Sequence, residues 1–328
     1  MADLAFAAIA AWMVAFALTG WLAHRIRHLA VDVPGQRSLH ERPTPRTGGI
    51  GLLAGLLAGI GVLYVTRGDV PPPFDGLPLA VALGLLVTVS FLDDLGHVSI
   101  LSRLLVQIAV AAVLATATGL PVPWLILAVP GMVWMVNLYN FMDGMDGFAG
   151  GMAVFGFGTL ATLAVWAGAD ELAVVPSLVT VAALGFLAWN FPPARIFLGD
   201  AGATFLGMLA AWLLLVFHRQ AILPIWLGLL LFAAFVVDAT VTLLRRMLRG
   251  DRFWEPHREH YYQRLVRRGW GHRRTVLLEY LIMAGCSVTV LLVWRASAAV
   301  QWLAVAGWLI LFAVLMRGVD ATERNEGA

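Results

Sequence analysis

The sequence predicts an all-α polytopic membrane protein with about eleven transmembrane helices, each needing roughly 20 mostly apolar residues. Of its 328 residues, 60% are hydrophobic and 13% are charged. A soluble domain is nearer 45–50% apolar and about 25% charged. Apolar stretches of spanning length recur along the whole chain. We therefore expect one integral membrane domain, residues 1–328, with a longer polar loop at about 245–275.

The predicted helices follow from the apolar stretches and the breaks between them. The breaks at Gly119–Pro123 and His218–Gln220 are the least marked. The first stretch lacks a basic segment and a cleavage site, so we interpret it as a span rather than a signal peptide. The spans cover roughly residues 4–23, 48–66, 77–92, 104–119, 122–138, 150–168, 172–189, 203–217, 222–243, 276–294 and 299–316.

The arginines predict the orientation of these helices. All 22 basic residues are arginine, and the span count places 19 of them on one side. Only Arg67, Arg219 and Arg295 fall on the other side. Because basic residues concentrate in cytoplasmic loops, we expect a periplasmic N-terminus and a cytoplasmic C-terminus. The expected macromolecular partner is the lipid bilayer and not a nucleic acid, and the single cysteine, Cys286, excludes a disulfide framework.

Acidic residues interrupt the apolar sequence at four places. Carboxylates beside or within spans are costly and usually serve a function. The four places are Asp93-Asp94, Asp143 with Asp146 in NLYNFMDGMDG, Asp200 in FPPARIFLGDAG, and Asp238 in an apolar run. The span count brings the first three to the same cytoplasmic boundary. Acids gathered there indicate a divalent metal and a phosphate-bearing substrate.

The motif NLYNFMDGMDG is the most informative of these. Asn137 and Asn140 share one helical face, which Asp143 and Asp146 would continue. Four oxygen-bearing side chains in this arrangement suit Mg²⁺ and phosphate oxygens. The adjacent Asp93 and Asp94 repel each other unless a cation lies nearby, and Arg103 could return to the same site.

The remaining motifs admit more than one interpretation. Asp200 lies at the predicted start of the eighth helix, which it could cap and whose N–H groups favour anions. Asp238 is expected to pair with an arginine or to pack as a polar group between helices. The first connection offers Arg37, His40, Arg42 and Arg46 as donors, and its prolines exclude regular helix. In the last loop, His257, Arg258 and His260 suit pyrophosphate or sugar better than zinc.

Taken together, the motifs resemble those of the polyprenyl-phosphate N-acetylhexosamine-1-phosphate transferases of the bacterial cytoplasmic membrane. The matching blocks, in order, are RSxHxxPTPRxGG, DD, NxxNxxDGxDG, NFxPAxxFxGDAG and a His-containing final loop. The resemblance implies transfer of an N-acetylhexosamine 1-phosphate from a UDP-sugar to undecaprenyl phosphate, with release of UMP. The final loop, HREHYYQR, is more similar to O-antigen-initiating members than to the triple-His phospho-MurNAc-pentapeptide translocase, which is the alternative.

The resemblance also implies residue roles and partners. The cofactor would be Mg²⁺, or Mn²⁺ in its place, and a homodimer is compatible with the family. Asp93, Asp94 and Asp200 would be catalytic, with Asn140 and Asp200 as metal ligands. Asp143, Asp146, Asn190 and Phe197 would bind the nucleotide, and Arg103, His257, Arg258 and His260 the pyrophosphate or sugar. The active site would face the cytoplasm.

A cation-coupled transporter is the competing hypothesis from a different class. Transporter acids tend to lie near the bilayer midplane, often at broken helices in repeated halves. Here three of the four acidic patches lie at span ends, and the sequence shows no repeat. The sequence therefore favours the transferase, acting by a single displacement in which positioning and charge neutralisation dominate.

Overall fold

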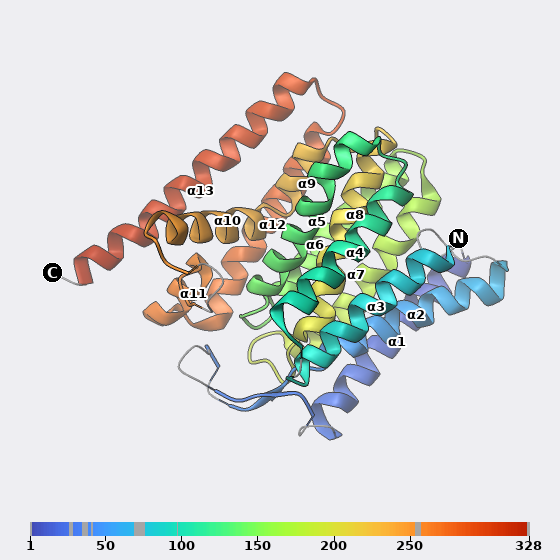
Figure 1. The fold of residues 1–328 in the computed structure, drawn as a ribbon, viewed down its shortest axis with the longest axis horizontal. Helices are drawn as coiled ribbons and strands as arrows, with labels where there is room; N and C mark the ends of the chain where they lie inside the picture. Colours follow the sequence, from blue (N-terminus) through green and yellow to red (C-terminus); the bar gives the residue numbers. More distant parts are fainter. Residues whose placement is uncertain are drawn as a thin grey trace.

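The protein is an all-α polytopic membrane protein, which confirms the predicted fold class (Figure 1). The computed structural model describes residues 2–25, 29–34, 39–40, 42–68, 76–96, 98–252 and 257–326. Within these residues, ten helices are long and apolar enough to cross a membrane. The number is eleven if one sharply bent helix pair forms a single span.

The helices follow the order of the predicted spans. The long helices are α1 (Ala2–Arg25), α2 (Gly48–Arg67), α3 (Leu77–Asp94), α4 (Ile100–Ala117), α5 (Val122–Met142), α6 (Phe148–Trp166), α7 (Asp170–Asn190), α8 (Gly199–Arg219), α12 (Gly271–Val293) and α13 (Ala298–Glu326). The shorter elements are α9 (Ile225–Leu231), α10 (Ala233–Leu248), α11 (Tyr261–Leu265) and the π-helical turn η1 (Val266–Trp270).

Helix α8 forms the centre of the bundle and is the most deeply buried of the long helices. It packs against α5, α3 and α2. Small residues permit this close packing: a Cβ on Gly49 of α2 would lie 2.6 Å from the Cα of Gly202 in α8. Close helix approach through small residues is typical of membrane bundles.

The expected ninth span is not one continuous helix. The helices α9 and α10 meet at Phe232 at an angle of 87°. Helix α10 has one polar side, which includes Asp238 and Thr242, and it ends at Leu248, beyond the predicted boundary. These polar groups are bonded to one another and to α11, so α10 extends away from the direction of α9 (Figure 1).

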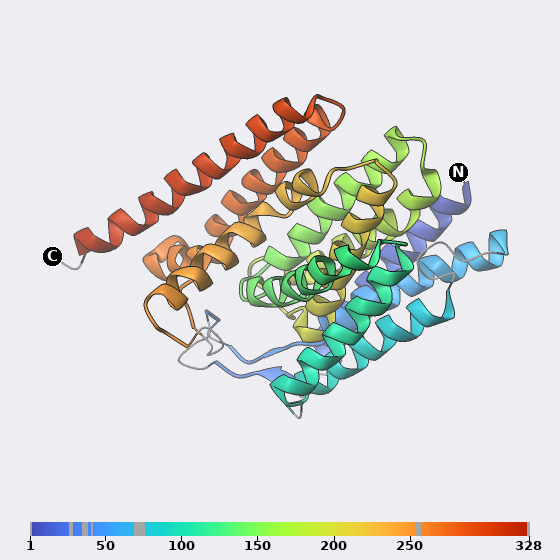
Figure 2. The same cartoon turned by 45° about the horizontal axis from the view of Figure 1, so that its top comes forward.

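The first connection lies across one end of the bundle, as Figures 1 and 2 show. It contains a two-residue antiparallel pair, β1 (Val31–Asp32) and β2 (Thr44–Pro45). The Phe197 N–H donates to the Pro45 carbonyl at 2.8 Å, and the Gly49 N–H donates to the Leu198 carbonyl at 2.7 Å. These bonds join the first connection to the start of α8. Arg37 lies outside the described residues.

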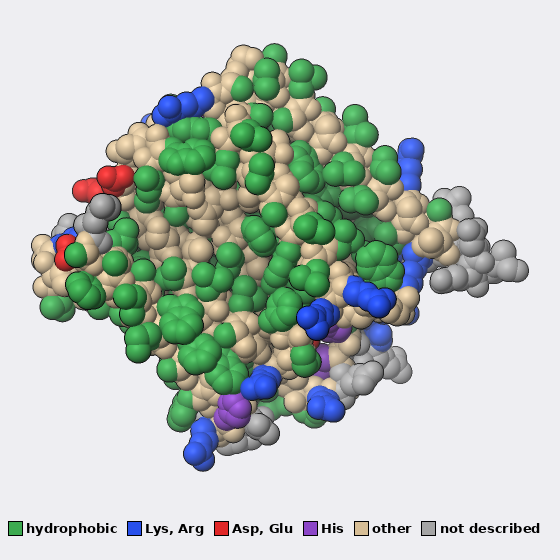
Figure 3. Space-filling model, turned by 180° about the vertical axis from the view of Figure 1, so that it is seen from behind, with side chains coloured by type: hydrophobic (Ala, Val, Ile, Leu, Met, Phe, Trp, Pro, Cys, Tyr) green, Lys and Arg blue, Asp and Glu red, His purple; other side chains and the backbone are tan. Residues whose placement is uncertain are grey.

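Hydrophobic side chains cover most of one broad face of the molecule, whereas arginine and histidine gather mainly along its lower and right margins (Figure 3). Such a division is expected of a surface that faces lipid along its middle and water or headgroups at its ends.

Candidate active site

A carboxylate from another helix caps the N-terminus of α8. The Asp94 carboxylate, fully buried at the end of α3, accepts hydrogen bonds from the N–H groups of Asp200 at 3.0 Å and Ala201 at 3.1 Å. The Asp143 carboxyl lies next to the Gly199 backbone. The expectation that Asp200 caps this helix is therefore wrong, because its side chain makes no capping hydrogen bond among the described residues.

Gly199 makes this arrangement possible. Its φ of +78° lies in the left-handed region, which glycine adopts without the steric cost of a Cβ. A Cβ there would overlap the Arg46 carbonyl and would lie 3.0 Å from Asp94 Oδ2. The Gly-Asp-Ala sequence thus allows the first connection, α3 and α8 to meet at one point.

Asp93 and Asp200 face each other beside this junction. Their carboxyl groups lie within hydrogen-bonding distance. The Arg103 guanidinium is hydrogen-bonded to Asp93 and lies 3.6 Å from Asp200 Oδ2. Arg103 therefore does return to the Asp93 site from the start of α4. Asp93 and Asp200 are both partly exposed, at 14% and 20%, whereas Asp94 is not.

A second arginine, Arg46, approaches from the first connection. Its Nε lies 3.9 Å from Asp94 Oδ1. This Nε is buried and has no hydrogen-bond partner among the described residues, while the Nη2 of Arg46 donates to the Asp94 carbonyl at 3.5 Å. Arg46 therefore holds the first connection against the end of α3. The sequence offered Arg46 only as one of several donors, because an arginine in a positive loop carries no signal of its own.

The charges of this cluster fit a divalent cation. The members are Asp93, Asp94, Asp143, Asp200, Arg46 and Arg103, which sum to −4 + 2 = −2 when ionised. Over the described residues, no three His, Cys, Asp or Glu side chains converge to form an all-protein metal site. Mg²⁺ usually binds one or two carboxylates together with substrate phosphate oxygens. Asp93 and Asp200 supply two such carboxylates close together, and metal binding by them stays a prediction.

The helical face predicted to contain Asn137, Asn140, Asp143 and Asp146 is not continuous, because α5 ends at Met142. Asn137 donates to Gln107 and to the Val133 carbonyl, so its amide is engaged within the bundle. Tyr139 packs on Gly207 of α8 and Asp143 reaches Gly199. The last turn of α5, which contains Asn140, therefore runs alongside the first turns of α8. Metal binding by Asn140 stays a prediction.

Asp143 lies just beyond the membrane-spanning part of α5. Burial, with the nearby Asp200 carboxylate, raises the pKa of the Asp143 carboxyl well above its usual range. A cation next to Asp143, or a hydrogen-bond donor of a bound ligand, would lower this pKa again, because either one favours the ionised carboxylate.

Two predicted nucleotide residues, Asp146 and Asn190, make structural contacts. Asn190 is buried, and its amide accepts from the Gly147 N–H and donates to the Ile196 carbonyl. Asp146 accepts from the Ala194 N–H and lies 2.9 Å from His272 Nδ1. These bonds hold the DGxDG turn against the 190–197 segment. A nucleotide-binding role for either residue stays a prediction.

Phe197 and His272 connect this region to the first connection. The Phe197 ring packs edge-on against His40, with centroids 4.9 Å apart. His272 Nε2 lies 3.2 Å from the Leu39 carbonyl. Asp143, Asp146 and Asn190 therefore contact the backbone of residues 194–199, which includes Phe197, although the four residues come from two separate motifs.

The final loop is held by Asp238. The Asp238 carboxylate accepts from the N–H groups of Tyr261 and Tyr262 at 3.0 and 3.1 Å, and from Thr242. Of the two expectations for Asp238, packing as a polar group between helices is therefore confirmed, and no ion pair with an arginine is found among the described residues. His260 Nδ1 lies 3.4 Å from Asp238 Oδ1. The polar residues of α10 and the start of α11 were too far apart in sequence for this contact to be inferred.

The loop reaches the DGxDG turn through Tyr262. The Tyr262 hydroxyl donates to the Phe141 carbonyl, and His260 stacks on the Phe141 ring with centroids 6.4 Å apart. His257 lies 4.7 Å from His260, ring to ring. No described contact joins His257 or Arg258 directly to Asp93 or Asp200. The His257–His260 loop therefore contacts the end of α5 at Phe141, and not the Asp93–Asp200 pair, among the described residues.

The fold and this charged cluster define a multi-pass membrane protein suited to binding phosphate groups, and comparison with known proteins identifies the family. Residues 77–218 match the model of glycosyl transferase family 4. The chain is 31% identical to a probable undecaprenyl-phosphate N-acetylglucosaminyl 1-phosphate transferase of Bacillus subtilis, with 88% of this chain and 81% of the relative covered.

Two further relatives carry similar names. A decaprenyl-phosphate N-acetylglucosaminephosphotransferase of Mycolicibacterium smegmatis is 30% identical over 98% of this chain and 91% of its own length. An undecaprenyl-phosphate alpha-N-acetylglucosaminyl 1-phosphate transferase of Yersinia pestis is 28% identical over 86% and 82%. The chain belongs to the polyprenyl-phosphate N-acetylglucosamine-1-phosphate transferase family.

Proposed function

We propose that this protein transfers N-acetylglucosamine 1-phosphate from UDP-N-acetylglucosamine to undecaprenyl phosphate and releases UMP. The observation that carries the proposal is the Asp93–Asp200–Arg103 cluster at the end of the bundle, in a chain whose relatives are named for this activity. The arginine bias supports a cytoplasmic active site in a bacterial inner membrane.

The acceptor needs little activation. A phosphate monoester has a second pKa near about 6 and is mostly a dianion at neutral pH. Positioning and charge neutralisation should therefore dominate the chemistry. Arg103, which is partly exposed between Asp93 and Asp200, is the cationic donor that would orient phosphate oxygens.

Asp93 and Asp94 would have different roles. Both oxygens of Asp94 are bonded to the start of α8, so Asp94 would position Asp200. Asp93 is more exposed and contacts Arg103, so Asp93 would orient the acceptor or take its residual proton. Asp200, with Asn140, would hold Mg²⁺, which when bound neutralises the charge developing on the departing phosphate.

Transfer can be tested with purified protein, undecaprenyl phosphate, Mg²⁺ and radiolabelled UDP-N-acetylglucosamine. We expect label in a butanol-extractable lipid together with equimolar UMP. Asp200→Asn should abolish both products while preserving thermal stability, and Glu171→Gln, at an exposed position outside the site, should behave as wild type. Full turnover by Asp200→Asn would refute the role of Asp200.

A comparison of donors tests the sugar and the pathway. We propose initiation of a lipid-linked envelope glycan such as O-antigen. UDP-N-acetylglucosamine and its deoxy relatives should therefore be used in preference to UDP-MurNAc-pentapeptide. Substituting His257 or His260 should alter the KM for UDP-sugars more than the KM for the lipid. Preference for the pentapeptide donor would favour the translocase alternative.

A further inference from the structure

A hollow of about 240 Å³ lies between α10, α11 and α13. Of the residues that line it, the sequence assigned only Arg258 to the reaction, and among the described residues Arg258 does not contact Asp93 or Asp200. Five arginines line it, accompanied by two acids. The lining residues are Thr242, Arg245, Arg249, Arg258, Glu259, Tyr261, Arg264, Arg267 and Asp320. Five guanidiniums against two carboxylates leave a net charge of +3. This excess predicts an anionic ligand.

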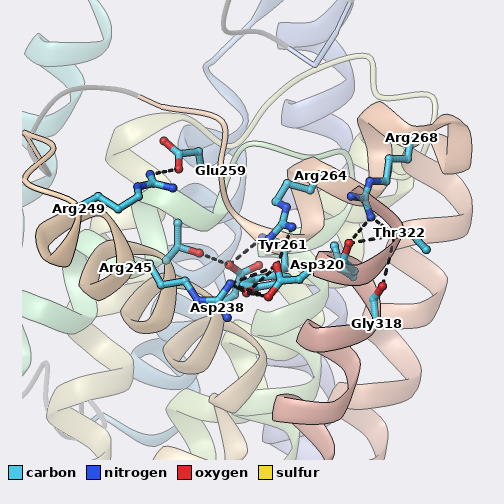
Figure 4. Close-up of polar contacts among 12 residues, drawn as sticks. Asp238, Arg245, Arg249, Glu259, Tyr261, Arg264, Arg268, Gly318, Asp320 and Thr322 are labelled. Atoms are coloured by element: carbon cyan, nitrogen blue, oxygen red, sulfur yellow. Dashed lines mark hydrogen bonds and ion pairs between the residues drawn. The ribbon is translucent and has the colours of Figure 1, made fainter. Parts of the chain in front are cut away.

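Several of these arginines are held in place. Asp320 of α13 lies 2.9 Å from Arg245 and 2.7 Å from Arg264 (Figure 4). The Arg245 and Arg264 guanidiniums also lie over the Tyr261 ring, 5.3 and 4.6 Å from its centroid. Glu259 pairs with Arg249 and Arg246, and Arg249 pairs as well with Asp251, which does not line the hollow, at 2.7 Å. Guanidiniums fixed in this way lose less entropy when they bind an oxyanion.

The positive charge is not fully matched by the protein. Arg245, Arg249 and Arg264 contact the two acids, but no carboxylate among the described residues pairs with Arg267. Because Arg267 is exposed and lines the hollow, its guanidinium is available to a ligand. Several convergent guanidiniums are typical of phosphate recognition.

The surroundings of the hollow indicate where the ligand comes from. On α10, Leu244, Met247 and Leu248 are 51%, 53% and 89% exposed. They adjoin Arg245, in the last turn of α10, and Arg249, the residue that follows its last turn. A helix with apolar side chains beside basic ones is suited to the boundary between acyl chains and headgroups.

The hollow and the candidate active site lie on different sides of the 257–260 loop. His260 stacks on Phe141, whereas Arg258 and Glu259 line the hollow. A water-soluble sugar nucleotide would gain nothing from the exposed leucines of α10. We propose that the hollow binds the phosphate headgroup of an anionic phospholipid of the surrounding bilayer.

The proposal can be tested by measuring lipid retention. The purified full-length protein is exchanged into phosphatidylcholine nanodiscs that contain a small fraction of phosphatidylglycerol, and the retained phosphatidylglycerol is quantified by native mass spectrometry. Each arginine near an anionic lipid surface contributes about 1 kcal/mol, or roughly a fivefold change in affinity. Arg267→Gln should therefore lower retention about fivefold without lowering thermal stability.

The matched control is Arg273→Gln, at an exposed arginine of α12 that does not line the hollow. It should retain phosphatidylglycerol as wild type does. Equal retention by wild type and Arg267→Gln, or an equal fall in both variants, would overturn the proposal. Displacement of the lipid by millimolar glycerol 3-phosphate or UDP would also overturn it, by identifying a site for soluble phosphates.

Discussion

The carboxylate of Asp94 accepts the backbone N–H of Asp200, which lies 106 residues further along the chain, at 3.0 Å. The neighbouring Asp93 instead meets the side chain of Asp200. Two adjacent carboxylates thus contact Asp200 in different ways: Asp94 binds its backbone, whereas Asp93 lies beside its carboxyl group. We therefore assign Asp94 a positioning role and Asp93 a role in the transfer itself.

We expect Asp94→Asn to lower stability and Asp93→Asn to lower turnover. An asparagine at position 94 keeps one acceptor oxygen and loses the charge, and loss of a helix cap costs about 0.5–2 kcal/mol. Among the described residues, the Asp93 carboxylate bonds Arg103 and no backbone group, so its replacement should preserve stability and reduce transfer roughly 100-fold or more, as removal of a preorganised group does. Tryptophan-fluorescence melting and UMP release measure the two effects. Equal melting curves for the two variants would contradict the assignment.

Gly199→Ala should inactivate and destabilise the protein. The left-handed φ of +78° and the nearby Arg46 carbonyl both exclude a Cβ. Strain of this kind costs about 1–3 kcal/mol. Gly84→Ala is the control, because a Cβ there meets nothing within 4 Å. The melting temperatures of both variants, measured in the same detergent, test this expectation. A wild-type melting temperature and activity for Gly199→Ala would show that the contact between the first connection, α3 and α8 can rearrange.

Transfer should require a divalent cation. The cluster around Asp200 carries a net charge of −2 when ionised, which disfavours approach of a phosphate dianion. EDTA should abolish UMP release, and Mg²⁺ or Mn²⁺ should restore it in wild type. Asp200→Asn should not be restored by either ion. Undiminished transfer after dialysis against EDTA would exclude a metal at this cluster.

The His257–His260 loop should loosen in acid. Burial and the nearby His260 and Arg246 lower the pKa of His257 to about 4, and its Nδ1 accepts the Glu259 N–H. His257 in the opened loop would titrate near its ordinary 6.5. The closed loop therefore keeps its full stability above pH 6.5 and loses it progressively as the pH falls toward 4.

Hydrogen exchange of the loop amides at several pH values, corrected for intrinsic rates, measures this loosening. His257→Gln should flatten the pH dependence, because glutamine does not titrate. His218→Gln, at an exposed position at the far end of α8, is the control and should keep the wild-type slope. An unchanged slope in His257→Gln would assign the pH dependence to another group.

Much of the fold could be predicted because apolar length and arginine placement are local signals. The predicted boundaries of α1, α2 and α7 differ from the observed ones by only a few residues. The bend at Phe232 was not predicted, because the apolar run continues across it. The contacts that hold α10 against α11 join Asp238 to residues more than 20 positions later, which the local sequence does not reveal.

The sequence predicted which residues belong to the candidate site better than it predicted how they contact one another. The pairing of Asp93, Arg103 and Asp200 followed from counting spans, because their motifs all fall at one end of the bundle. The capping of α8 by Asp94 could not be predicted, since it depends on backbone N–H groups that carry no sequence signature. Arg46 gave no distinct signal for a similar reason: its contact with Asp94 arises only after the first connection folds over α3.

The contact between Asp94 and α8 has a consequence for biogenesis. When α3 first leaves the ribosome, the N–H groups that will bind its terminal carboxylate have not yet been synthesised. Asp94 must therefore remain hydrated until residues 199–201 are inserted. The reaction centre can form only after eight helices have entered the bilayer, and a truncated nascent chain that ends earlier should contain the aspartates without a functional arrangement of them.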